Sequence, residues 1–163
     1  VPLIVRWPGV VKPGSVCDVP VSSVDFCPTL LEVAGVKPGP KIDGVSITPL
    51  LKQTGRFERE ALFWHYPHYS NQGGVPGGSV RKGNYKLIEF YEDGRLELFD
   101  LSEDPGERKN LVRMLPQKAA ELHDLLKHWR ASVGARMPAM NPNYDEVKAD
   151  QGLTGAEPKT DPL

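Results

Sequence analysis

The sequence contains few cysteines, no long apolar run and no excess of charge of either sign. Its two cysteines, Cys17 and Cys27, are too few for a disulfide framework, and we expect free thiols. No apolar run approaches the roughly 20 residues that cross a bilayer, so we expect no membrane span. Lys and Arg number 20 against 21 Asp and Glu, which excludes the basic footprint of a nucleic-acid partner.

The first residues lack an initiator methionine and the basic-then-apolar layout of a signal peptide. Residues 1–7 instead form an apolar run closed by Pro8 and Gly9, which predicts a buried strand ending in a turn. A buried strand at this position leads us to expect a further portion of polypeptide upstream. The apolar surface that such a strand would expose predicts self-association of the isolated chain.

The remaining patterns predict a mixed α/β chain. Residues 22–35 carry helix-start signals, an apolar face that includes Phe26 and Leu30, and a glycine suited to the helix end. Residues 61–66 have strand composition, and the glycine-rich residues 70–79 predict a flexible loop. Two β-rich runs, 85–91 and 96–101, surround an Asp-Gly turn and predict a hairpin. An amphipathic helix is expected from about residue 116, covering the hairpin sheet.

Four blocks of sequence occur in the order that they have at the end of sulfatases. They read VPLIVRWPG at 1–9, VDFCPTLLEVAG at 24–35, RKGNYKLI at 81–88 and ELFDLSEDPGERKNL at 97–111. The chain therefore resembles the C-terminal part of an arylsulfatase-type sulfatase of the alkaline phosphatase superfamily. The resemblance implies three segments: 1–56, the last strand and helix of the large α/β domain; 57–137, a small antiparallel sheet packed against one amphipathic helix; and 138–163, an extended, partly disordered tail.

Sulfate-ester hydrolysis needs a nucleophile, charge stabilisation and a general acid. In the resembled family a cysteine within Cys-x-Pro-x-Arg, oxidised to formylglycine, supplies the nucleophile, and a divalent cation, usually Ca²⁺, assists. Neither Cys17 nor Cys27 has proline at +2 or arginine at +4. The resemblance also places the cation's ligands upstream. We therefore expect no catalytic residue and no metal ligand in this chain, which by itself should be inactive.

The polar and aromatic residues around 65–69 are the candidates for substrate recognition. The resemblance implies that this region reaches the rim of the catalytic pocket, so His65, His68 and Tyr69 are candidate contacts to the non-sulfated part of an aryl or carbohydrate sulfate ester. Alternatively, His65 packs under the loop and His68 is solvated. Arg81 could bind an oxyanion through its guanidinium fork, or form a surface salt bridge. His123 and His128, five apart on the expected helix, do not have metal-pair spacing, and we expect both to face solvent.

Two other functions stay open at this point. The parent protein could be a phosphate or phosphonate ester hydrolase of the same superfamily, with Thr or Ser as its nucleophile. The chain could also be a stand-alone binding module. The resemblance implies a periplasmic or secreted parent, although the chain carries no export signal.

Overall fold

The computed structural model describes residues 2–37, 39, 41–71 and 73–144. The chain divides into two compact units, Val1–Leu62 and Phe63–Leu163, where a boundary after residue 56 was expected. Residues 138–144 form neither helix nor strand, and the rest of the predicted tail lies outside the described residues. Among the described residues, none of the helices combines the length and hydropathy that a bilayer crossing would need.

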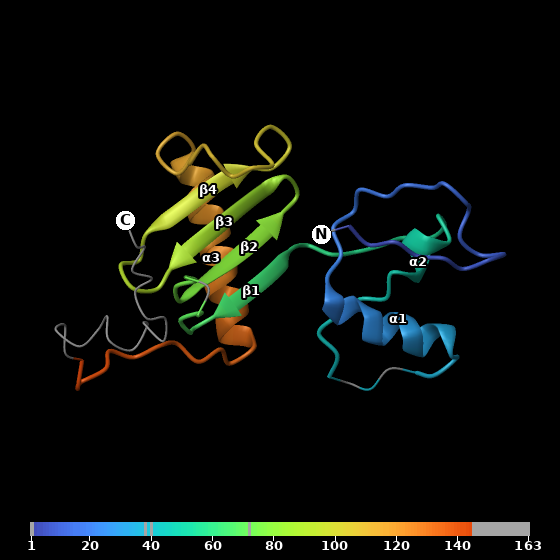
Figure 1. Cartoon of the computed structure of the whole chain (residues 1–163), viewed down its shortest axis with the longest axis horizontal. Coiled ribbons are helices and arrows are strands. Elements are labelled where there is room, and N and C mark those ends of the chain that lie inside the picture. The colour runs from blue at the N-terminus through green and yellow to red at the C-terminus, as the bar shows by residue number, and fades with distance from the viewer. Residues whose placement is uncertain (1, 38, 40, 72, 145–163) are drawn as a thin grey trace, which may run out of the picture. The chain divides into compact units, whose positions relative to one another are not determined.

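The first unit contains a 3₁₀ turn, η1 (Ser23–Asp25), and two helices, α1 (Phe26–Val33) and α2 (Thr48–Leu51) (Figure 1). Gly35, at a φ of 69°, ends the α1 segment in the left-handed conformation expected for a residue following a helix. The helix predicted within residues 22–35 is thus confirmed. Cys17 and Cys27 are free and exposed.

Two sequence predictions about apolar residues of the first unit are wrong. Residues 2–7 form no strand, and Ile4 is 91% exposed. A strand requires a hydrogen-bonded neighbour, and the described residues offer none to this segment. The expected buried face of α1 is exposed as well: the side chains of Phe26, Leu30 and Val33, one helical stripe, are 42%, 66% and 47% exposed.

A buried carboxylate organises the first unit. Asp25 has no exposed surface, and its Oδ2 accepts hydrogen bonds from the Ser22 amide at 2.7 Å and from Arg59 Nη1 at 2.8 Å. Its Oδ1 accepts from the Val45 amide at 3.0 Å and from Arg59 Nη2. Burial alone would raise the pKa of Asp25, but the bonds from Arg59, Ser22 and Val45 hold that pKa below its ordinary value.

The second unit is a four-stranded sheet with one helix against it. The strands β1 (Leu62–Tyr66), β2 (Gly77–Lys82), β3 (Tyr85–Phe90) and β4 (Leu96–Asp100) lie side by side in sequence order, and β2/β3 and β3/β4 are antiparallel. The helix α3 (Pro116–Ser132) runs across one face of this sheet (Figure 1). The predicted hairpin and amphipathic helix are therefore confirmed.

The core of this unit lies between α3 and the sheet. It consists of apolar side chains from three strands and the helix, all at most 3% exposed: Val80, Leu87, Leu98, Ala119, Leu122 and Leu126. Beside it, the rings of Phe63 and Trp129 stack with centroids 4.9 Å apart. Residues alternate across a strand, so their immediate neighbours, including Trp64, Ser79 and Ile88, face the other side of the sheet. We call that side the open face.

Strand β2 begins inside the stretch that was predicted to be a loop. A Cβ on Gly78 would overlap the hydroxyl of Tyr91 and lie 3.2 Å from the carbonyl oxygen of Trp64. Gly78 is therefore a strand residue that permits close approach of neighbouring groups, a meaning glycine can have within a sheet. The predicted loop is correct only for the part that precedes Gly77.

The outer edge of β4 is paired by the chain that follows it. The Leu98 amide donates to Asn110 Oδ1 at 3.1 Å, and the Leu98 carbonyl accepts from the Leu111 amide at 2.7 Å. The carbonyl of Leu96 accepts from Asn110 Nδ2 at 3.4 Å, and that of Asp100 accepts from the Asp104 amide at 2.8 Å. The backbone groups that an edge strand normally leaves open are thus occupied.

Candidate functional site

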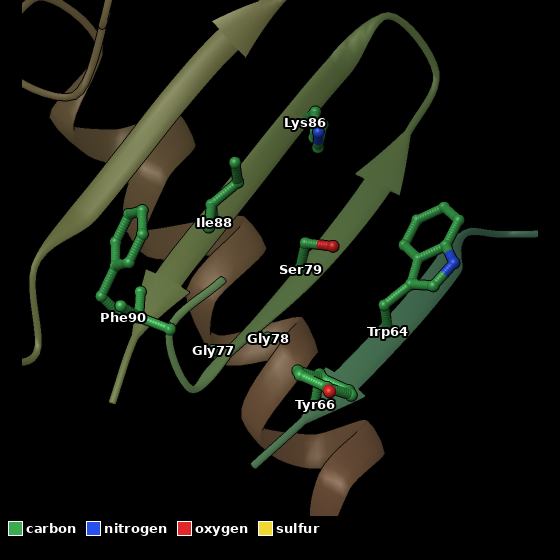
Figure 2. Close-up of a pocket in the computed structure, with 9 residues that line it drawn as sticks. Trp64, Tyr66, Gly77, Gly78, Ser79, Lys86, Ile88 and Phe90 are labelled. Atoms are coloured by element: carbon green, nitrogen blue, oxygen red, sulfur yellow. The ribbon is translucent and has the colours of Figure 1, made fainter. Parts of the chain in front are cut away.

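The open face of the sheet carries a shallow groove of about 220 Å³. Its lining comes from three strands and the loop before β2: Trp64, Tyr66, Val75, Gly77, Gly78, Ser79, Lys86, Ile88 and Phe90. Figure 2 shows their side chains on the side of the sheet opposite α3. Trp64 and Tyr66 are 43% and 50% exposed, so two aromatic rings of β1 stand free on this face. The groove is mainly apolar, and Lys86 contributes its cation.

The charge of Lys86 is already neutralised within the chain. Its Nζ donates to both carboxylate oxygens of Glu107, at 2.7 and 2.8 Å. Arg81 lies directly opposite Lys86 in the β2/β3 register and therefore on the same face. Its Nε is buried and has no hydrogen-bond partner among the described residues. The salt bridge that the sequence allowed for Arg81 is absent from the described part of the chain.

The segment after β1 presents the polar candidates. The rings of Tyr66 and His68 meet edge to face with centroids 5.6 Å apart. The hydroxyl of Tyr69 donates to Glu92 Oε1 at 2.6 Å, which fastens this loop to the turn between β3 and β4. The same hydrogen bond raises the pKa of Tyr69 because it favours the protonated phenol. Tyr69 is nevertheless 62% exposed, so its ring is available to a ligand.

His65 lies on the other side of the sheet from the groove. Its Nδ1 is 2.6 Å from Tyr91 Oη and its Nε2 is 2.9 Å from the carbonyl oxygen of Arg136. Because the carbonyl can only accept, Nε2 carries the proton and donates, and a neutral ring then accepts from Tyr91 through Nδ1. Both ring nitrogens are therefore used in joining β1 to β3 and to the chain after α3. This arrangement matches the alternative in which His65 packs within the fold.

A buried ion pair beside this histidine joins α3 to β3. Arg130 Nη1 donates to Glu89 Oε2 at 2.6 Å, and its guanidinium carbon lies 5.3 Å from the centre of the Tyr91 ring. Burial raises the pKa of Tyr91, since it disfavours the phenolate. His123 Nε2 is 3.3 Å from Glu89 Oε1, so the prediction that His123 faces solvent is wrong. His128 is exposed, as predicted.

No metal centre is formed by the described residues, among which no three His, Cys, Asp or Glu side chains converge. The carboxylate with the most donors around it, Asp25, already has its oxygens filled by Arg59 and two backbone amides. Neither the cation nor the formylglycine of the resembled family is fitted by the residues present, and no catalytic step is assigned to them.

Comparison with known proteins identifies this architecture. Residues 1–132 match the family model described as N-sulphoglucosamine sulphohydrolase, C-terminal. The chain belongs to the sulfatase family. A sulfatase from Formosa agariphila is 38% identical over 146 residues, which cover 79% of this chain and 26% of that protein. An N-acetylglucosamine-6-O-sulfatase from Bacteroides thetaiotaomicron is 35% identical, with 77% of this chain and 24% of that protein covered.

Solved structures agree with the sulfatase assignment. One is of a protein in complex with its substrate D-glucosamine-2-N,6-O-disulfate; it has a TM-score of 0.66 and 32% identity, and the match covers 77% of this chain and 27% of that one. A phosphonate monoester hydrolase from Silicibacter pomeroyi has a TM-score of 0.62 at 23% identity, over 88% of this chain and 29% of that one, and shows the fold alone. The expected alkaline-phosphatase-like fold is confirmed. The chain spans about a quarter of the length of the curated relatives named above.

Proposed function

We propose that this chain is the C-terminal portion of a sulfatase that hydrolyses sulfate esters of carbohydrates or aryl alcohols. The observation that carries the proposal is the match of residues 1–132 to a sulfatase C-terminal model. Carbohydrate esters are favoured over aryl esters because two of the relatives described above carry amino-sugar substrates in their names. The formylglycine nucleophile and a Ca²⁺ ion would belong to the upstream portion of the parent protein, and the isolated chain would be inactive.

The role proposed for this chain is recognition of the alcohol part of the substrate. His68 and Tyr69 follow β1 on a loop that the Tyr69–Glu92 hydrogen bond holds in place, and aromatic rings provide faces for sugar stacking. His65 would act as a positioning residue, since its two nitrogens bind Tyr91 and Arg136. Arg81 lies within β2 rather than on this loop, so the proposed substrate contact rests on His68 and Tyr69.

The test uses the polypeptide encoded by the complete reading frame. The parent protein should release sulfate from a 6-O-sulfated amino sugar, and the isolated 163-residue chain should release none. Faster turnover of a phosphonate monoester would instead favour the phosphonate hydrolase. Release of sulfate by the isolated chain would contradict the placement of the nucleophile upstream. Recovery of the parent in the periplasmic or culture fraction would test the proposed export.

The recognition role is tested by His68→Ala in the parent protein. If His68 contacts the sugar, KM for the sulfated sugar should rise about tenfold, the loss expected for one hydrogen bond, whereas KM for a small aryl sulfate should not change. His128→Ala is the matched control, because His128 is an exposed histidine on α3. Equal effects on both substrates, or an equal effect of the control, would rule out the contact.

A further inference from the structure

The open face of the sheet has the composition of an interface that lacks its partner. Trp64 and Tyr66 are about half exposed, and Val75 beside them is 39% exposed. Together with Ile88 and Phe90 they line one groove, and Figure 2 shows the five strand side chains of this groove with no covering element. The opposite face, by contrast, is sealed by α3. A contiguous patch of aromatic and aliphatic side chains at the surface marks a binding surface.

Arg81 adds a chemical requirement to this surface. Its Nε is buried and lacks an acceptor among the described residues, although buried donors are almost always paired in folded proteins. Lys86 directly opposite cannot help, since it carries the same charge and is occupied by Glu107. Whatever covers the open face should therefore bring an oxygen acceptor, a carboxylate or a backbone carbonyl, to Arg81.

We infer that the occupant of the open face is the upstream portion of the parent sulfatase, docked with an oxygen acceptor against Arg81. This inference rests on the proposed function. Most of either sulfatase relative lies outside the matched segment, since the chain covers 26% and 24% of them, and the matched model is a C-terminal one. A large covalently linked partner is thus the occupant that the comparisons supply, and its covalent linkage gives it a high effective concentration at this face.

Site-specific thiol labelling tests whether the face is covered. Ser79→Cys places a thiol in the groove, and Lys127→Cys places one on exposed helix surface as the matched control. Maleimide labelling is followed by mass spectrometry of the peptide that carries each new cysteine, in the isolated chain at monomeric concentration and in the parent protein. Docking predicts labelling of the S79C variant at least about tenfold slower in the parent, because labelling then requires local opening, with little change for the control.

Other outcomes of the labelling would overturn the inference. Equal rates for the S79C variant in the two polypeptides would show that the upstream portion leaves this face open. Equal rates combined with protection that rises with concentration of the isolated chain would show a second copy as the occupant. A reading frame without an upstream portion would also overturn it. Labelling does not require activity, so a protected but catalytically inactive parent would reject the proposed function alone.

The acceptor for Arg81 is tested with Arg81→Met. In the isolated chain the urea midpoint should stay constant or rise, because the buried Nε has no partner to lose. In the parent protein the midpoint should fall, because the acceptor would lose its donor. Lys127→Met is the control, and equal shifts in the two polypeptides would refute the docked acceptor.

Discussion

The sharpest stability prediction concerns Asp25→Asn. The Asp25 carboxylate is fully buried and the Arg59 side chain is only 11% exposed, so neutralising Asp25 leaves a largely buried guanidinium without its anion. Removing one partner of a buried, hydrogen-bonded ion pair costs about 3 kcal/mol or more. We expect a loss of that size in the first unit, with no change in the second.

Native-state hydrogen exchange is the assay that isolates this effect. The Ile47 amide donates to Thr29 Oγ1 at 3.0 Å, so it reports opening of the unit and not the loss of one bond to Asp25. A 3 kcal/mol loss should speed its exchange by about 100-fold. Glu32→Gln, at an exposed position of α1, removes the same charge and should change nothing. Exchange at Ile47 within twofold of the wild type would refute the assignment of Asp25 as the organising residue.

The same ion pair predicts a pH dependence. The folded pKa of Asp25 lies below its unfolded value, which is about 3.9. Its contribution is therefore fully present above pH of about 4 and is lost as the pH falls through the folded pKa. The urea midpoint of the first unit should decline in that acidic window in the wild type, and Asp25→Asn should show a flatter profile.

Three further predictions concern the second unit and the whole chain. Gly78→Ala should destabilise the second unit by about 1–3 kcal/mol because the new methyl group would overlap the Tyr91 hydroxyl; urea unfolding of the isolated chain measures this. Leu126→Ala should cost about 2–5 kcal/mol in the same assay, since Leu126 has no exposed surface. The isolated chain should sediment as larger species with rising concentration because both units expose apolar side chains, and a monomer at every concentration would contradict this.

The elements that could be predicted from the sequence are those fixed by local chemistry. The Asp-Gly turn and its flanking β-rich runs determine the β3/β4 hairpin, which spans Tyr85–Phe90 and Leu96–Asp100. The apolar period from residue 116 likewise determines α3. In both cases the signal and the structure lie within a few residues of each other.

The features that sequence reasoning missed depend on contacts between distant residues. Gly77 and Gly78 looked like loop residues, yet the strand needs glycine where the Tyr91 hydroxyl approaches. The partner of Asp25, Arg59, lies 34 positions away and has no local signal. His65 was placed with the recognition residues, but the alternation along β1 turns it toward Tyr91 and away from Trp64. The exposed stripe of α1 depends on a partner that the described residues do not contain.

The pairing of the outer edge of β4 limits how this sheet can grow. Asn110 and Leu111 already occupy the outward groups of Leu98, and Asn110 also reaches Leu96. An added peptide strand would have to displace them before it could extend the ladder at that edge. Templated strand addition, whether by a second molecule or by a misfolded neighbour, is therefore disfavoured beside β4, and the side-chain amide of one asparagine acts there as a guard against fibril formation.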